Sequence, residues 1–389
     1  MEKIEKVKKL WKEGKLFNVV YNRYKPLAKG LKYIFHEPSM KKIVIHCPKY
    51  CEVPKDKKEM ELVERIYNSF KAMKSVQEKV SKKYLPSALW QEQLNKSYSS
   101  LLSNDLSKFH FFLCNFGTWK TYHGIESTTL IHSNSKNPIR KLYLKNDVFF
   151  RSLKIWQWFY NNRKPLKRLS YPTYGNQAGA YIDNTFVGVG SFFNEIYGSI
   201  LSGLIKDKEH PVIVDLGAGY GKLSYFILRD IDKFTFIDLD LPEVLCLAAY
   251  YLMKVWPDKK ALLYGEDAYS EKSYKMYDMI FMPPQEIEKI GENSVDLLVN
   301  KNSLGEMTKE AVENYMRYIL KATKYFFHMN HDIYPNYYGH EERGLLGYEY
   351  PIDNFKLLFR YPDISHMLYL GGLDFHQDIF LYLYERKKQ

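Results

Sequence analysis

Residues 211–221 read Pro-Val-Ile-Val-Asp-Leu-Gly-Ala-Gly-Tyr-Gly, an apolar run that ends in an acid and continues into three alternating glycines. The run predicts a buried strand, and the residues after it predict a tight turn and then a helix. Because glycine has no Cβ, the backbone at Gly217 and Gly219 can fold tightly and approach a ligand. Free N–H groups at the helix start would meet the polar end of that ligand. The stretch therefore predicts a nucleotide cofactor at the carboxyl end of a parallel strand.

The spacing of the glycines narrows the choice of cofactor. A dinucleotide fingerprint has the pattern G-x-G-x-x-G, but the final position counted from Gly217 is Lys222. The observed D-x-G-x-G-x-G resembles motif I of S-adenosylmethionine-dependent methyltransferases. The resemblance implies that Asp215 interacts, directly or through water, with the charged amino group of S-adenosyl-L-methionine. It also implies cofactor contacts from the turn itself, at Gly217, Ala218, Gly219 and Gly221.

A second acidic strand end follows about 20 residues later, as Rossmann folds place it, in Phe236-Ile-Asp-Leu-Asp-Leu-Pro-Glu243. A carboxylate at this point can accept hydrogen bonds from both ribose hydroxyls. The local Asp-Leu-Pro-Glu resembles the D-L-P-x-V turn of small-molecule O-methyltransferases. The resemblance implies that Asp240, rather than Asp238, binds the ribose, and that Leu241 beside it also contacts the cofactor. An acid that caps the helix starting at Pro242 explains Asp240 equally well.

The third signal lies in residues 291–307, where a polar turn, a buried strand and a polar cluster follow one another. This order resembles motif IV of the same enzymes, where the acceptor meets the methyl group. Nucleic-acid amino-methyltransferases carry [D/N/S]-P-P-[Y/F] at the end of this strand, whereas this chain has Asn300-Lys-Asn-Ser303. We therefore do not expect a nucleic-acid acceptor. The resemblance implies cofactor contacts from Asn300 and, near the adenine, from Met282 and Pro283.

The pattern from about Tyr171 to Glu385 resembles a bacterial family of sugar O-methyltransferases found with surface-polysaccharide genes. The stretches that show the resemblance are DLGAGYGKLS, DLPEVLCLAAYYL, FMPPQEIEKIGENSVDLLVNKNSLGEM and YGNQAGAYIDNTFVGVGSFFNEIYGS. Two departures stand out: Lys301 interrupts the family's N-T-x-S-x-x-E-M, and Asp215 replaces its usual Glu. The resemblance implies S-adenosylmethionine-dependent methylation of a sugar hydroxyl in surface polysaccharide biosynthesis. Residues 1–170 match no family that we can name.

A sugar hydroxyl must lose its proton as it is methylated, so the reaction needs a general base. Glu306 is the first choice because it follows the fourth strand, although a role as a helix-start acid explains it equally well. His328 and His331, at the end of the fifth strand, are the rivals, and each can be a structural histidine. We expect residues 171–205 to cover the acceptor, with substrate contacts at Asn176, Gln177, Asn194, Asn302 and Ser303. No carboxylate set suited to a divalent ion is visible, so we predict a metal-free site.

The fold class follows from alternating helices and short apolar strands after about residue 192. We predict an α/β protein with a Rossmann-like, mostly parallel, seven-stranded methyltransferase sheet in residues 171–389. A basic, mainly helical domain would occupy residues 1–170. The individual strands expected are Val212–Asp215, Thr235–Leu239, Met279–Phe281, Val295–Asn300, Tyr325–Asn330 and Ile379–Tyr384, and the helices Asn194–Ile205, Gly221–Asp230, Pro242–Val255 and Lys309–Ala322.

Charge divides unevenly along the chain, whose formal net charge is +12. Residues 1–180 hold 35 Lys and Arg against 14 Asp and Glu, and the remainder holds 22 against 31. The basic half favours an anionic partner: a glycan acceptor, recruited through the basic run Arg163–Arg168, an anionic membrane surface or RNA. The alternatives are an RNA or other small-molecule methyltransferase, a cofactor-binding regulator without catalysis, and a merely solvated lysine-rich surface.

Composition also bears on the compartment. No apolar run long enough to span a membrane appears, and the N-terminal residues do not resemble a secretory signal. Four cysteines are too few for a disulfide framework in a chain of 389 residues. We expect a soluble, cytoplasmic protein. His46, Cys47 and Cys51 could supply three metal ligands, but no second pair follows at zinc-site spacing.

Overall fold

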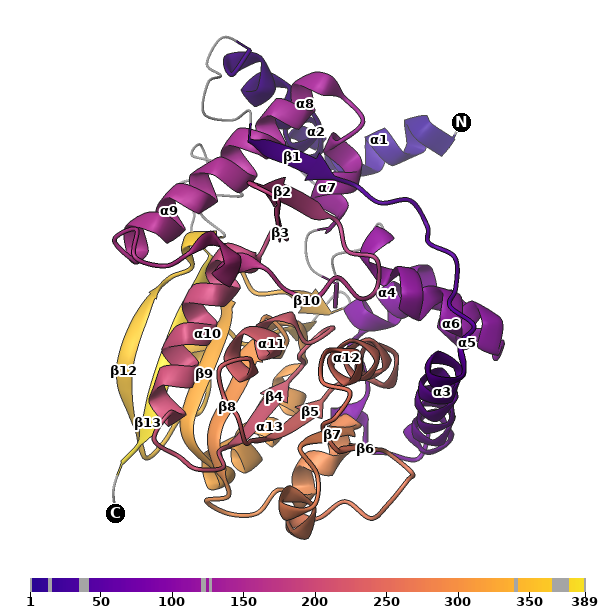
Figure 1. The fold of residues 1–389 in the computed structure, drawn as a ribbon, viewed down its shortest axis with the longest axis vertical. Coiled ribbons are helices and arrows are strands. Elements are labelled where there is room, and N and C mark those ends of the chain that lie inside the picture. The colour runs from indigo at the N-terminus through magenta and orange to yellow at the C-terminus, as the bar shows by residue number, and fades with distance from the viewer. Residues whose placement is uncertain are drawn as a thin grey trace.

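The computed structural model describes residues 2–12, 16–34, 42–119, 124–125, 128–338, 342–365 and 378–387. Its centre is an eight-stranded sheet in the C-terminal half of the chain (Figure 1). The strands, in sheet order, are β12 (Phe355–Pro362), β13 (Ile379–Arg386), β9 (Thr323–His331), β8 (Val295–Lys301), β4 (Val212–Leu216), β5 (Thr235–Leu239), β7 (Met279–Met282) and β6 (Ala261–Leu263).

The strand order reverses at β4, which lies between β5 on one side and β8 on the other. These three strands are parallel, as are β6, β7 and β9, whereas β13 runs antiparallel to both of its neighbours. A reversal of this kind opens a crevice at the carboxyl ends of the strands, where α/β sheets bind ligands. The glycine turn after β4 lies at that crevice.

The predicted α/β, mostly parallel sheet is confirmed, but it has eight strands rather than seven. Two strands, one at each edge of the sheet, are absent from the six that the sequence predicts individually: β12, which pairs with β13, and β6, a strand of only three residues that pairs with β7. A segment as short as β6 gives little periodicity in the sequence, and β12 is mostly exposed, so it lacks a continuous apolar run. The six individually predicted strands are present, most of them one or two residues longer than expected.

Helices cover both faces of the sheet. Alternate strand residues enter two different cores: Ile213 packs with α10 (Ser191–Ile205), α11 (Lys222–Leu228) and α12 (Pro242–Val255), whereas Val214 packs with α13 (Lys309–Ala322). The period of two expected for a strand buried on both faces explains this division. The predicted bounds of α12 and α13 are confirmed to the residue.

The N-terminal half is mainly helical, as predicted. Its helices are α1 (Glu2–Lys12), α2 (Leu16–Lys32), α3 (Lys57–Gln77), α4 (Ala88–Ser97), α5 (Ser99–Leu102), α6 (Leu106–Asn115), α7 (Thr128–Asn134), α8 (Pro138–Tyr143) and α9 (Arg151–Phe159). A short strand, β1 (Ile43–His46), pairs antiparallel with β2 (Gly179–Ile182), which pairs in turn with β3 (Thr185–Val187). The division at residue 170 stays a prediction, and this small sheet crosses it.

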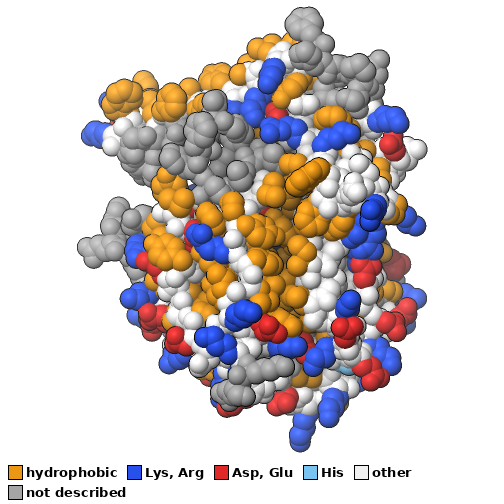
Figure 2. Space-filling model, turned by 90° about the vertical axis from the view of Figure 1, so that its left-hand side faces the viewer, with side chains coloured by type: hydrophobic (Ala, Val, Ile, Leu, Met, Phe, Trp, Pro, Cys, Tyr) orange, Lys and Arg blue, Asp and Glu red, His pale blue; other side chains and the backbone are white. Residues whose placement is uncertain are grey.

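Two further features concern the surface. Within the described residues, no helix is both long and apolar enough to cross a bilayer. Figure 2 shows hydrophobic side chains gathered in the middle of the face that carries the sheet edge at β12, where Leu357 and Leu358 are exposed.

Candidate active site

A pocket opens at the carboxyl ends of β4, β5 and β8, where the strand order reverses. It contains most of the residues predicted for the cofactor and one of those predicted for catalysis, Glu306. The predicted residues that line it are Asp215, Gly217, Ala218, Gly219, Asp240, Leu241, Asn302, Ser303 and Glu306. Segments about 90 residues apart in the sequence thus meet in one cavity.

The glycine turn is shaped by contacts that leave no room for a side chain. Gly217 and Gly219 have φ values of +82° and +63°, in the left-handed region that favours glycine. A Cβ on Gly217 would lie 2.3 Å from the hydroxyl oxygen of Ser303, and one on Gly219 would lie 2.9 Å from the carbonyl oxygen of Gly124. Both glycines are therefore required for the backbone to form this wall of the pocket.

Asp240 lies at the end of β5 and is fixed by two backbone groups. Its Oδ2 accepts a hydrogen bond from the N–H of Gly219 at 3.1 Å, and its Oδ1 accepts one from the N–H of Leu241 at 2.7 Å. The carboxylate thereby links the glycine turn to the strand next to it. Burial raises the pKa of Asp240 above its usual range.

Two more carboxylates lie beside Asp240, on neighbouring strands. Asp215 and Asp238 face each other in the register of β4 and β5, and both are buried. Burial raises the pKa of Asp215 to about 7, against the hydrogen bond that Ser224 donates to its Oδ2 at 2.6 Å. The other oxygen of Asp215 has no hydrogen-bond partner. Carboxylates buried together in this way favour a cationic ligand, since positive charge stabilises their ionised forms.

The end of β8 is held against β4 by polar side chains. Asn300 and Ser303 both donate to the carbonyl oxygen of Leu216, at 2.7 and 2.8 Å. Asn300 is fully buried and does not line the pocket, so its side chain serves to hold β8 against β4. Asn302 does line the pocket, and its buried Oδ1 has no hydrogen-bond partner.

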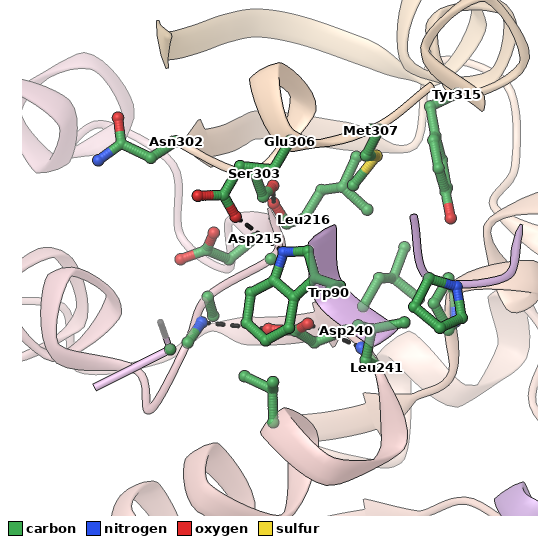
Figure 3. A pocket seen from close by; sticks show the side chains of 18 of the residues that line it. Trp90, Asp215, Leu216, Asp240, Leu241, Asn302, Ser303, Glu306, Met307 and Tyr315 are labelled. Carbon is green, nitrogen blue, oxygen red and sulfur yellow. Dashed lines mark hydrogen bonds between the residues drawn. The ribbon is translucent and has the colours of Figure 1, made fainter. Parts of the chain in front are cut away.

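Glu306 lines the pocket and is held by a tryptophan from the N-terminal half. The indole Nε1–H of Trp90 donates to Glu306 Oε2 at 2.8 Å, as Figure 3 shows. Burial raises the pKa of Glu306 to about 7, although the Trp90 hydrogen bond and nearby His331 both oppose the rise. A carboxylate with its pKa near neutrality is matched to general-base catalysis at physiological pH.

The two candidate histidines lie outside the lining of the pocket. His328 is completely buried, and its ring stacks on Tyr382 with centroids 4.5 Å apart. Burial lowers the pKa of His328 to about 3, which makes it a weak base. His331 lies 2.5 Å from Asp378 and close to Glu306. Of the three candidates, Glu306 alone among the described residues borders the cavity.

Five other predicted residues have structural contacts instead. Met282 and Pro283 are buried, and the pocket is bordered by the next residue, Pro284. Gly221 does not line the pocket, and a Cβ there would meet Leu252 of α12. The remaining two are Asn176, which donates to the carbonyl oxygen of Lys49 at 2.6 Å, and Gln177, which donates to that of Tyr174 at 3.0 Å.

The predicted cover over the acceptor, residues 171–205, contributes none of the residues that line the pocket. Asn194 comes nearest in function, because its Oδ1 accepts a hydrogen bond from the pocket residue Lys301 at 3.0 Å. Tyr171 similarly lies beneath the ammonium group of Lys222, 4.4 Å from the ring centroid. Asn194 and Tyr171 thus hold two lysines of the pocket in place without lining the pocket themselves.

The N-terminal half covers the pocket instead. Residues 83–87, Trp90 and Gly124 all line the cavity, although the sequence predicts no site residue before Asn176. Helix α4, which carries Trp90, begins at a conventional cap, with Ser87 accepting from the Trp90 N–H. Nothing in the local sequence marks Trp90 as different from the other tryptophans, so the contact could be found only from the fold.

Two cations of the basic run 163–168, Lys164 and Arg168, make contacts within the chain, whereas Arg163 and Lys167 are exposed, so recruitment of an acceptor by the whole run is not supported. Glu195 is completely buried and accepts from Lys164 at 3.1 Å and from the Trp156 indole at 2.8 Å. Arg168 binds Asp230 and approaches Glu195 at 3.5 Å. These cations neutralise a buried acid where the two halves meet.

A second buried cluster lies between α3 and α6, and it consists of Glu59, His110 and Cys114. Their ligand atoms lie within 4.8 Å of one another, which is compatible with a metal site. However, Lys254 already donates to Glu59 at 2.5 Å, and Tyr250 donates to it at 2.7 Å. The ammonium group supplies the positive charge that the carboxylate needs. Within the described residues, the group His46, Cys47 and Cys51 does not form a comparable cluster.

Comparison with known proteins leaves the family of this chain open. No family model and no curated protein matches the sequence. Among solved structures, a mitomycin 7-O-methyltransferase shows 13% identity over 51% of this chain, with a TM-score of 0.32, and this chain spans 57% of its length. A magnesium protoporphyrin IX methyltransferase from Synechocystis, solved with bound SAM, shows 12% identity over 50% of this chain and 80% of its own, with a TM-score of 0.33.

A SAM-dependent methyltransferase from Leishmania major shows a likeness of the same degree. It is 12% identical over 50% of this chain and 72% of its own, with a TM-score of 0.32. Resemblance at this level does not determine what a chain does. The residues of the pocket are therefore the better guide to function.

Proposed function

We propose that this chain is an S-adenosylmethionine-dependent O-methyltransferase that acts on a sugar hydroxyl. The observation that carries the proposal is the meeting, in one pocket, of the glycine turn, Asp240 and Glu306. The first two suit a nucleoside cofactor, and the third suits an acceptor that must lose a proton. The O-methyltransferases among the similar solved structures share only the general fold at low TM-scores, so the residues themselves carry the proposal.

The residues fit this cofactor in three respects. The left-handed glycines provide a wall without side chains, and Asp240 presents a carboxylate beside that wall. Asp215 contributes a buried oxygen without a hydrogen-bond partner. S-adenosylmethionine carries a sulfonium and an ammonium group, so it offers the positive charge that these buried acids favour. When bound, the cofactor supplies an activated methyl group on a built-in leaving group.

The chain's own task is to position and deprotonate the acceptor. The Glu306 carboxylate borders the pocket, where it is available to take a proton from an acceptor hydroxyl. Trp90 both orients that carboxylate and presents an aromatic ring to the cavity. Sugars pack their apolar faces on such rings, which supports a glycan acceptor. We place this reaction in surface polysaccharide biosynthesis on the strength of the sequence resemblance.

Mass spectrometry of the surface glycan, with and without the gene for this chain, tests the proposal. We expect a hexose or related sugar to lose about 14 mass units, corresponding to one methyl group in place of a hydrogen, when the protein is missing. Complementation with the wild-type chain should restore the methyl group, and complementation with Glu306→Gln should not. An unchanged glycan, together with methylated RNA that disappears with the gene, would transfer the assignment to an RNA methyltransferase.

A further inference from the structure

Helices α1 and α2 lie at one end of the molecule (Figure 1). Each carries large apolar side chains that are exposed to solvent. On α2 they form a stripe that consists of Phe17, Val20, Tyr24 and Leu31, with exposed fractions of 76%, 45%, 55% and 48%. Spacings of three, four and seven residues place these side chains on one face of the helix. Large apolar side chains gathered on one outward face mark an interaction surface.

The opposite face of α2 is fixed to the body of the protein, so the orientation of the stripe is defined. Gly30 packs so closely on α8 that a Cβ would lie 1.9 Å from the carbonyl oxygen of Ile139. Arg140 of α8 donates to the carbonyl oxygen of Arg23 at 2.8 Å, and Tyr33 donates to buried Asp147 at 3.2 Å. The helix is therefore already packed on the protein, and the side chains of its apolar stripe take no part in that packing.

Helix α1, which precedes α2 in the chain and contacts it, carries a second exposed apolar stripe. Ile4, Val7 and Trp11 recur at spacings of three and four and have exposed fractions of 63%, 50% and 73%. Lys8 and Lys12, both exposed, lie beside this stripe. Along residues 1–32 the sequence holds ten Lys and Arg against three Glu.

We propose that α1 and α2 form a docking surface for an anionic lipid bilayer. Apolar and aromatic side chains flanked by lysines are the signature of helices that lie in the plane of a membrane interface. Charge complementarity favours this occupant over a second copy of the chain, because two copies would bring their lysines together. It also favours lipid over another protein, since lysine is depleted in protein–protein interfaces. The inference is independent of the enzymatic proposal.

Sedimentation of the full chain with lipid vesicles tests this inference. We expect binding to vesicles containing phosphatidylglycerol, much weaker binding to pure phosphatidylcholine, and a fall in binding as salt rises. Combined substitution of Trp11→Ser, Phe17→Ser and Tyr24→Ser should weaken binding to the anionic vesicles at least tenfold. Trp158→Ser is the matched control, because Trp158 is 77% exposed but lies on α9. It should bind as the wild type does.

The triple variant also needs its fold and its oligomeric state measured. An unchanged thermal midpoint would show that it is folded, since all three side chains are exposed. Binding by the triple variant equal to that of the wild type would overturn the inference, as would the absence of any vesicle binding by the wild type. Sedimentation velocity that showed a wild-type dimer dissociated by the triple substitution would assign the surface to a second copy and overturn it equally.

Discussion

The carboxyl ends of β4, β5 and β8 and the segment around Trp90 line the same pocket, yet only the first could be foreseen from the sequence. In the sheet, the relevant side chains come directly after apolar strands, and parallel strands bring their ends together at one edge. Trp90 comes from a helix 216 residues before its partner Glu306. The difference teaches that a local motif locates the cofactor, whereas the residues that tune the chemistry depend on long-range packing.

The largest effect should come from the sheet side of this comparison. Glu306→Gln keeps the shape of the side chain but removes its basicity, so kcat should fall by about 10²–10⁴-fold. Cofactor affinity should change only a few-fold. Steady-state kinetics with a sugar acceptor measures the first, and calorimetry measures the second. Glu310→Gln is the matched control, because Glu310 is an exposed acid in the next helix. If Glu306→Gln kept near-normal kcat, the base would have to be sought at His331.

The next largest effect should be on stability, at the contact of Arg168 with Glu195 and Asp230 between the N-terminal and C-terminal halves. Arg168→Glu would place a negative charge beside buried Glu195 and against Asp230, so it should lower the free energy of unfolding by about 3 kcal/mol or more. Lys167→Glu, one residue away and exposed, should change it by about 0.5 kcal/mol or less. Chemical denaturation of both variants provides the measurement. If the two variants were equally stable, the contacts of Arg168 would not stabilise the fold, and the basic run would be a solvated surface that is free to recruit an acceptor.

The smallest effect should be a shift in the pH dependence of kcat, caused by substitution of Trp90 in the N-terminal half. Trp90→Phe keeps a ring but loses the N–H that favours the ionised form of Glu306, so the pKa of Glu306 should rise above about 7. A general base acts only when deprotonated, and the acidic limb of the kcat profile should therefore move to higher pH. The contribution of His331 to the same pKa would remain. A profile that kept its position while KM alone changed would show that Trp90 contacts the acceptor but does not tune the base.

Much of the fold is predictable because its residues alternate with a clear period. Thr235–Leu239, α12 and α13 are predicted to the residue, since apolar runs, proline and cap residues mark their bounds. The three-residue strand β6 escapes prediction because its pattern is too short. The pairing of β1 with β2 escapes it because the pairing joins residues more than 130 positions apart.

The site is predictable to a similar extent and for similar reasons. Asp215 lies near the end of β4, Asp240 and Glu306 follow β5 and β8, and all three line the pocket as expected. Asn300 also lies near a strand end, but its side chain binds the neighbouring strand, and His328 lies inside β9, where aromatic rings enclose it. A sequence shows that a polar residue lies at a strand end, but not whether a neighbour already satisfies it.

Calorimetric titration of the full chain with S-adenosylmethionine tests the cofactor assignment most directly. We predict binding of one cofactor per chain, weakened at least tenfold, or about 1.4 kcal/mol, by Gly219→Val and by Asp240→Ala. Gly203→Ala, where a Cβ would meet nothing within 4 Å, should bind as the wild type does. A wild-type chain that binds no cofactor, or two pocket variants that bind it with unchanged affinity, would contradict the assignment.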